Sequence, residues 1–351
     1  MTERAQYRII DANFNRAREA LRVIEEYCRF VLDHAGLSGR AKAMRHRLCA
    51  AIGQLDSDRL LASRDTTGDV GTGLSVQGQL ARRDLEDCLT AACKRLTEAL
   101  RVLAEVVHAQ DPAVAQTIEA IRYEAYSLER DIGMLALPRR VFGRVALYVV
   151  ISSNLPAEVL PCTAQCIAGG ADCVQLRCKH LPDRTHLALA QEFVRMCRDR
   201  GVVSIINDRV DLAVASDAHG VHLGSDDLPV GVARGLAHRP LIIGATTHTM
   251  EELERTCKEG PTYVAIGPVF ATATKPDLAL AGLGYVRQAV GRLAGTGISH
   301  VAIGGITVEN IDQVLQAGAR TIAVCSAVMT APDPTAVCRQ LKEQLTRYDR
   351  S

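Results

Sequence analysis

The sequence predicts an α/β protein in which an all-helical domain, residues 1–137, precedes a (β/α)8 TIM barrel, residues 141–351. The length of 351 residues is about twice that of a typical domain. Apolar residues recur at helical spacing before Pro138, whereas short apolar runs alternate with longer amphipathic stretches after it. The eight short runs fall in about 210 residues, which is the lower size limit for such a barrel.

The helical region contains a repeated motif. The pattern R-x-x-E-A-L-R-V-I-x-E begins at Arg16 and returns as R-x-x-E-A-L-R-V-L-x-E from Arg95, 79 residues later. Two copies suggest a duplication but are too few for a solenoid. Between them, residues 63–73 are too polar and glycine-rich for a helix. This segment is either a flexible loop or a turn that binds phosphate through its N–H groups, with Asp65 or Asp69 near a metal.

The strands of the second region are predicted from its short apolar runs, at 145–151, 172–177, 203–206, 220–223, 241–244, 263–266, 300–303 and 321–324. An open doubly wound sheet is the alternative arrangement for alternating strands and helices. That fold usually has a glycine-rich turn after its first strand, but here the turn is Ser-Ser-Asn-Leu-Pro. We therefore favour the barrel.

Composition excludes several classes of partner. The 41 basic and 40 acidic residues leave a net charge of +1, and aromatic residues make up only 4% of the chain. Neither a basic face nor a stacking platform for nucleic acid is expected. The N-terminus lacks a signal-peptide core, no apolar run is long enough to span a membrane, and the 12 cysteines contain no C-x-x-C pair. Free thiols in a reducing cytoplasm are expected, and the sequence is compatible with a homo-oligomer.

Polar side chains follow the second predicted strand, at the barrel end where active sites lie. Gln175, Arg177 and Lys179 alternate, so they share one face. Two cations and an amide on that face favour a polyanionic ligand, with a buried ion pair as the alternative.

The next two strands are followed by Asn207-Asp208 and by a loop that contains Asp226 and Asp227. Carboxylates from neighbouring strand ends, beside cations, match the requirements of a Mg²⁺–diphosphate, although either Asp226 or Asp227 could instead cap a helix.

The remaining strand ends are rich in hydroxyls and glycines. They contain the candidate residues Thr246, Thr272, Thr274, Lys275, Gly305, Cys325 and Ser326. Glycine after the seventh strand and a small residue after the eighth are typical of the phosphate-binding end of a barrel. His219, His222 and His248 are expected to be structural. No Cys-His pair, Ser-His-Asp set or Schiff-base lysine is apparent, which favours ionisation of a diphosphate ester and capture of the cation by a second substrate.

These motifs resemble the thiamine-phosphate synthase family. The patterns are Q-x-R-x-K, N-D, V-H-L-G-x-x-D, G-P-x-x-x-T-x-T-K, I-G-G-I-T and the final Ser326, in the family's order from Val145 to Ala327. The resemblance implies Mg²⁺-dependent joining of 4-amino-2-methyl-5-(diphosphooxymethyl)pyrimidine to a thiazole phosphate, with release of diphosphate. The thiazole is 4-methyl-5-(2-phosphoethyl)thiazole or its carboxylated form.

The resemblance also implies residue roles. Contacts to the pyrimidine diphosphate would come from Gln175, Arg177, Lys179, Asn207, Thr246 and Lys275, of which Arg177, Lys179 and Lys275 would be catalytic. Asp208 and Asp227 would hold Mg²⁺. The thiazole phosphate would be bound by Thr272, Thr274, Gly305, Cys325 and Ser326. The chain departs from the family at Thr246, where serine is usual, at Ala271, where proline is usual, and at Cys325, where an aliphatic residue is usual.

The helical region resembles a domain found fused to such synthases, through D-A-N-F-N-R-A-R-E-A-L-R from Asp11 and R-D-T-T-x-D-V-G from Arg64. That resemblance implies a kinase that makes the pyrimidine diphosphate from its monophosphate. A dimerisation or regulatory module is the alternative. For the barrel, the alternatives are a thiazole tautomerase, which would have no diphosphate to hold, and a non-catalytic sensor of phosphate ligands with a helical partner-binding arm.

Overall fold

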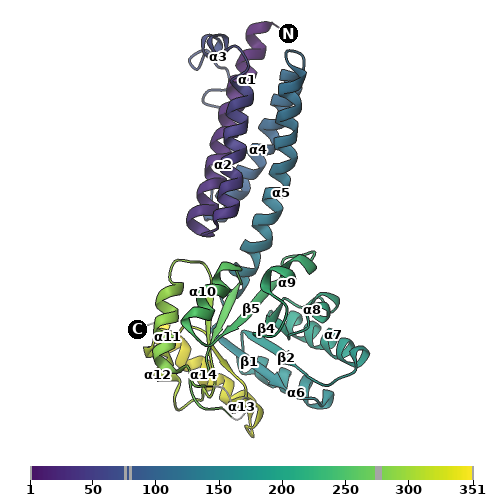
Figure 1. The fold of residues 1–351 in the computed structure, drawn as a ribbon, viewed down its shortest axis with the longest axis vertical. Coiled ribbons are helices and arrows are strands. Elements are labelled where there is room, and N and C mark those ends of the chain that lie inside the picture. Colours follow the sequence, from purple (N-terminus) through teal and green to yellow (C-terminus); the bar gives the residue numbers. More distant parts are fainter. Residues whose placement is uncertain (1, 75–76, 79–80, 273–278, 350–351) are drawn as a thin grey trace. The chain divides into compact units, whose positions relative to one another are not determined.

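The computed structural model describes residues 2–74, 77–78, 81–272 and 279–349. The chain divides into two compact units, Met1–Gly133 and Met134–Ser351 (Figure 1). The helix α5 (Pro112–Phe142) begins in the first unit and ends in the second, with Pro138 inside it. A proline within a helix removes one N–H donor without necessarily ending the helix, so the change of sequence pattern at Pro138 precedes the helix end.

The first unit consists of helices. They are α1 (Glu3–Glu26), the π-helical turn η1 (Tyr27–Val31), α2 (Ala35–Ile52), α3 (Ser57–Ser63), α4 (Leu85–His108) and the start of α5. The side chains of Thr2 and Asp84 cap α1 and α4 by accepting backbone N–H bonds. The two copies of the repeated motif lie in α1 and α4, which pack against each other. Corresponding positions are buried in both copies, at Ala20, Leu21, Ile24 and at Ala99, Leu100, Leu103.

The polar segment after α3 forms turns, as predicted, rather than helix. Its Arg64 donates to Asp11 of α1 at 2.6 Å. An oxygen of Asp65 accepts the Gly68 N–H at 2.8 Å, and an oxygen of Asp69 accepts a backbone N–H of its own turn at 2.9 Å. Each carboxylate thus stabilises a local turn, and a metal-binding role for either remains a prediction.

The second unit is a closed barrel of eight parallel strands within the described residues, as predicted. The strands are β1 (Leu147–Ser152), β2 (Cys173–Arg177), β3 (Val203–Asn207), β4 (Gly220–Leu223), β5 (Ile242–Thr247), β6 (Tyr263–Ile266), β7 (Ser299–Ile303) and β8 (Ile322–Val324). The helices are α6 (Pro156–Ala168), α7 (Asp183–Asp199), α8 (Val210–Ala215), α9 (Val230–Leu236), α10 (Met250–Lys258), α11 (Gly282–Leu293), α12 (Ile311–Gln316), α13 (Ser326–Met329) and α14 (Pro334–Asp349). Apolar side chains on alternate strand positions pack beneath these helices.

The base of the barrel interior is filled by aromatic rings. Phe142, at the end of α5, stacks on Tyr263 of β6 with ring centroids 4.0 Å apart, and Tyr148 of β1 packs edge-on against both. Gly244 of β5 makes this possible, because a Cβ there would overlap the Tyr263 ring. The filled base leaves the carboxyl ends of the strands as the open end of the interior.

All twelve cysteines lie in the described part of the chain and are free thiols. Among the helices of the described residues, none is both long enough and apolar enough to cross a bilayer.

Candidate active site

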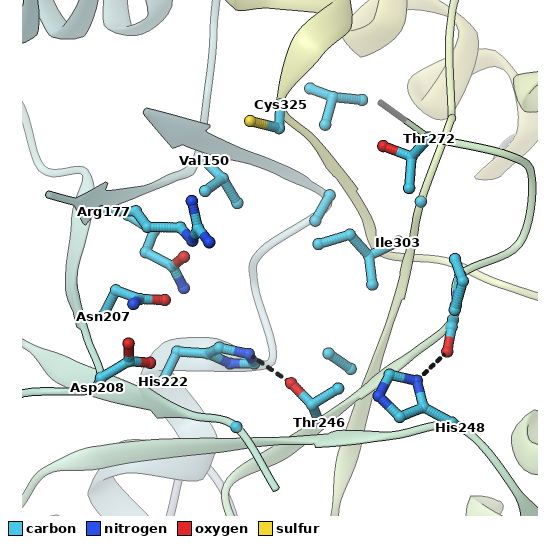
Figure 2. A pocket seen from close by; sticks show the side chains of 18 of the residues that line it. Val150, Arg177, Asn207, Asp208, His222, Thr246, His248, Thr272, Ile303 and Cys325 are labelled. Atoms are coloured by element: carbon cyan, nitrogen blue, oxygen red, sulfur yellow. Dashed lines mark hydrogen bonds between the residues drawn. The ribbon is translucent and has the colours of Figure 1, made fainter. Parts of the chain in front are cut away.

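A cavity of about 290 Å³ lies at the carboxyl ends of the barrel strands. It brings together the predicted residues Gln175, Arg177, Lys179, Asn207, Asp208, Asp227, Thr246, Thr272, Gly305, Cys325 and Ser326. Figure 2 shows Arg177, Asn207 and Asp208 on one side, with Thr272 and Ile303 on the other. The predicted Thr274 and Lys275 lie outside the described residues, within 273–278.

The cationic side of the cavity is built by the end of β2. Leu176 and Cys178 are buried in the outer core, so alternation directs Gln175, Arg177 and Lys179 to the cavity. An Arg177 guanidinium N–H donates to Ser152 Oγ at 2.7 Å. The backbone N–H of Lys179 donates to Asn154 Oδ1 at 2.9 Å. The sequence analysis did not identify Ser152 and Asn154 as supporting residues. The one indication in the sequence was that the turn after the first strand is polar, where an open doubly wound sheet would have a glycine-rich turn.

Asp208 occupies an unusual backbone conformation directly after β3. Its φ is 62°, in the left-handed region that favours glycine, asparagine and aspartate. The Asp208 N–H donates to the carbonyl of His222 on β4 at 2.8 Å, which ties the turn to the neighbouring strand. Non-glycine residues in this conformation cluster at functional sites.

Asp208 and Asp227 form a close acid pair. Burial, followed by the neighbouring Asp227 carboxyl, raises the pKa of Asp208 to about 6, while Lys179 and Arg177 act in the opposite direction. Asp227 Oδ2 accepts the Gly224 N–H at 2.6 Å, which orients that carboxylate. Asp227 therefore caps a turn and not the helix α9, whose N-cap is Pro229.

The donor chemistry of the acid pair fits a hard divalent cation, which would relieve the repulsion between two carboxylates. Within the described residues, no group of three or more His, Cys, Asp or Glu side chains is arranged to hold a metal. A cation here would therefore need substrate oxygens and water as further ligands. Mg²⁺ is commonly held in this way, by one or two carboxylates together with phosphate oxygens.

On the opposite side of the cavity, the backbone of one glycine turn lies very close to a neighbouring loop. Gly304 and Gly305 have φ of 109° and 64°. A Cβ at Gly305 would lie 2.5 Å from the carbonyl oxygen of Ala271, and a Cβ at Gly304 would lie 2.6 Å from Pro268. Only glycine fits both positions, which allows this turn of the cavity wall to lie directly against the loop that contains Pro268 and Ala271.

The three histidines all form hydrogen bonds within the barrel. His219 is structural as expected, with Nδ1 2.9 Å from Ser204 Oγ. His248 Nδ1 lies 2.6 Å from the Gly267 carbonyl, and His222 Nε2 lies 2.9 Å from Thr246 Oγ1 (Figure 2); these two histidines also line the cavity. Their signal was position, because each lies on or directly after a strand near its carboxyl end.

Known proteins resemble this chain over most of its length. A family model described as thiamine monophosphate synthase matches residues 147–328. A thiamine-phosphate synthase from a Nostoc species is 41% identical over 342 residues, which cover 97% of this chain and 94% of that protein. The chain belongs to the thiamine-phosphate synthase family. A Synechocystis thiamine-phosphate synthase is also 41% identical, over 97% of each chain.

Membership of the thiamine-phosphate synthase family makes the protein a transferase of thiamine biosynthesis. Among solved structures, thiamine phosphate pyrophosphorylase from Pyrococcus furiosus matches with 33% identity and a TM-score of 0.54. The match covers 60% of this chain and 98% of that one. A separate model, the ThiD2 family, matches residues 8–131 of the helical unit.

Proposed function

We propose that the barrel joins 4-amino-2-methyl-5-(diphosphooxymethyl)pyrimidine to 4-methyl-5-(2-phosphoethyl)thiazole, or to its carboxylated form with additional loss of CO₂, and releases diphosphate and thiamine monophosphate. The observation that carries this assignment is the composition of one cavity. Arg177 and Lys179 line it beside the Asp208–Asp227 pair, and the glycine turn at Gly305 lies across from them. One side suits a diphosphate, and the other suits a monophosphate.

The residues act mainly on the leaving group. Arg177, Lys179 and Asn207 bind the diphosphate, so negative charge that develops as the C–O bond breaks is stabilised in place. Mg²⁺ held by Asp208 and Asp227 would supply further charge neutralisation on the same oxygens. The bonding electron pair leaves with diphosphate, and the thiazole nitrogen then forms the new C–N bond. No protein base is required. The resemblance assigns Lys275 to the diphosphate as well.

The second substrate is held by its phosphate. Gly305, Cys325 and Ser326 offer backbone N–H groups and a hydroxyl, and Thr272 and Thr274 are assigned to the thiazole side by the resemblance. Binding both partners in one cavity turns the capture step into a reaction between neighbours, which prevents loss of the reactive cation to water.

The test is diphosphate release by the full chain with both substrates and Mg²⁺. We expect release only when all three are present, and its loss with EDTA. Thiazole isomerisation without the pyrimidine would support a tautomerase instead. Binding of phosphate ligands without any release would support a sensor. A tag-free, folded protein that gives no release under these conditions refutes the synthase assignment.

For the helical unit we propose a kinase that supplies the pyrimidine diphosphate from its monophosphate. The support is the resemblance together with a polar cluster on α1, in which Asp11 binds Arg64 and accepts from Asn15 at 3.2 Å. Full-length Asp208→Asn protein, given ATP and the pyrimidine monophosphate, should accumulate the diphosphate. If no ATP is consumed, or if ATP is hydrolysed without formation of the pyrimidine diphosphate, the dimerisation or regulatory module would be favoured. The free thiols support a cytoplasmic location for both activities.

A further inference from the structure

A chain of hydrogen bonds crosses the barrel interior and ends at the cavity. Gln175 Nε2 donates to the Tyr148 hydroxyl at 2.8 Å, and that hydroxyl lies 3.0 Å from the Tyr263 hydroxyl. The Tyr263 hydroxyl lies 3.0 Å from His222 Nδ1, and His222 Nε2 lies 2.9 Å from Thr246 Oγ1. Four consecutive bonds therefore join β2, β1, β6, β4 and β5.

The chain is isolated from solvent over most of its length. Tyr263 is 0% exposed, Tyr148 is 2% and Gln175 is 3%, so bulk water does not compete for these hydroxyls. A buried polar group without a partner is costly, which makes each bond of the chain dependent on its neighbours. Of these five residues, only His222 and Thr246 are partly exposed.

The direction of the chain follows from the number of protons available. An amide Nε2 can only donate, so the Tyr148 oxygen accepts from Gln175 and its proton goes to Tyr263. Tyr263 in turn donates to His222 Nδ1. A neutral histidine that accepts at Nδ1 carries its proton on Nε2, and Nε2 then donates to Thr246. The Thr246 hydroxyl accepts this bond and keeps its own proton for another partner.

Packing holds the central tyrosine where this direction requires it. The Tyr263 ring stacks between Phe142, with centroids 4.0 Å apart, and the His222 ring, with centroids 5.7 Å apart. The space for the ring exists because residue 244 is glycine. The position of the hydroxyl is thus set by the apolar base of the barrel, independently of any ligand.

We propose that Tyr148 and Tyr263 are positioning residues that fix the tautomer of His222, and so make the Thr246 hydroxyl a hydrogen-bond donor to a ring nitrogen of the pyrimidine substrate. This inference rests on the proposed function, which places the pyrimidine in this cavity. It goes beyond that function because it assigns the recognition of an acceptor atom to two residues buried below the site.

Three full-length variants test the proposal. Tyr148→Phe and Tyr263→Phe keep both aromatic rings and remove one hydroxyl each. The matched control is Tyr285→Phe, because Tyr285 is also buried and its hydroxyl donates to Thr247 at 2.8 Å, outside the chain. Diphosphate release is measured with the natural pyrimidine and with two pyridine analogues, in each of which one ring nitrogen is replaced by CH.

We expect Tyr148→Phe and Tyr263→Phe to lower kcat/KM for the pyrimidine diphosphate by about 10- to 100-fold, with the KM for thiazole phosphate within about twofold of the wild type. One analogue should be disfavoured about 10-fold or more by the wild type, and this discrimination should fall to about twofold in Tyr263→Phe. Unchanged discrimination in that variant, or an equal effect in Tyr285→Phe, overturns the proposal.

A second measurement requires no turnover. The ¹⁵N shifts of the imidazole in histidine-labelled protein report the tautomer, and the His222 signals are assigned by their absence in His222→Gln. The wild type should show the proton on Nε2, and Tyr263→Phe should show mixed tautomers. A wild-type proton on Nδ1 refutes the proposed direction. A correct tautomer without diphosphate release would instead locate the failure in the proposed function.

Discussion

Replacing Asp208 by asparagine should make the barrel more stable and the enzyme inactive. Asparagine keeps the size of the side chain and tolerates the left-handed φ of 62° at this position, whereas alanine would not. The substitution removes one of two carboxylates that repel each other in a half-buried site. We therefore expect the free energy of unfolding of the ligand-free barrel to increase.

The size of the effect follows from linkage. The folded protein holds the Asp208 proton up to a pKa of about 6, against an ordinary value of 3.8. Between these values the folded state binds more protons than the unfolded state, so stability falls as pH rises and the full penalty is present above pH 6. About two pKa units correspond to an upper value of about 3 kcal/mol, and partial solvation reduces this to about 1–3 kcal/mol.

Thermal unfolding at pH 5 and pH 7.5 checks this prediction. For a unit of about 200 residues, that energy corresponds to a melting temperature about 3–10 °C higher in Asp208→Asn at pH 7.5, with a smaller difference at pH 5. Turnover should fall at least about 100-fold, and added Mg²⁺ with diphosphate should stabilise only the wild type. Asp208→Ala serves as the control and should lose about 1 kcal/mol of the gain to backbone strain. An asparagine variant that is less stable than the wild type at pH 7.5 refutes the repulsion argument.

Three further predictions concern other parts of the barrel. Gly305→Ala should raise the KM for thiazole phosphate about 10-fold or more, because the new Cβ would lie 2.5 Å from the Ala271 carbonyl and the φ is 64°; equal KM changes for both substrates would contradict this. Burial lowers the pKa of the His300 imidazole to about 4. The unfolded chain therefore binds a proton at this residue that the folded barrel does not, and the free energy of unfolding falls as the pH drops from about 6.5 to 4. His300→Gln should remove up to about 3 kcal/mol of that fall, as measured by urea unfolding. Asp172→Ala should destabilise the barrel by about 2–4 kcal/mol without changing turnover of the folded enzyme. The reason is that Asp172 Oδ2 accepts the Leu147 N–H at 2.9 Å, at the start of β1 and β2, whereas the cavity lies at the carboxyl ends of the strands.

The strands could be predicted because they depend on local pattern. Buried parallel strands are short apolar runs, and each of the eight predicted runs overlaps an observed strand. The largest error is in β5, predicted to end at residue 244 and observed to continue to Thr247. Its last residues include Thr246, which faces the cavity, so the strand continues where its apolar pattern stops. The domain boundary near Pro138 stays a prediction, and the structure places this proline inside helix α5, which tolerates one missing N–H donor.

The candidate site was partly predictable because barrel geometry brings strand ends together. Gln175, Arg177 and Lys179 could be assigned to one face from alternation alone. The pairing of Asp208 with Asp227 also follows from adjacent strands. The link between Tyr148 and Tyr263 could not be predicted in this way, because the two residues are 115 positions apart and meet only when side chains cross the interior. Contacts of that kind depend on register and on the volume left by glycine at position 244.

The filling of the barrel base and the chemistry of the cavity are therefore connected. The two buried tyrosine hydroxyls at the base each require a partner. Those partners are Gln175 and His222, which also line the cavity. Satisfying the buried hydroxyls consequently fixes the orientation of two cavity residues before a substrate binds, which is the preorganisation that recognition of a planar heterocycle requires. A variant with leucine in place of both Tyr148 and Tyr263 should keep the barrel folded but lose the orientation of the two cavity residues. Such a variant would show that the fold can be retained while specificity for the heterocycle is lost.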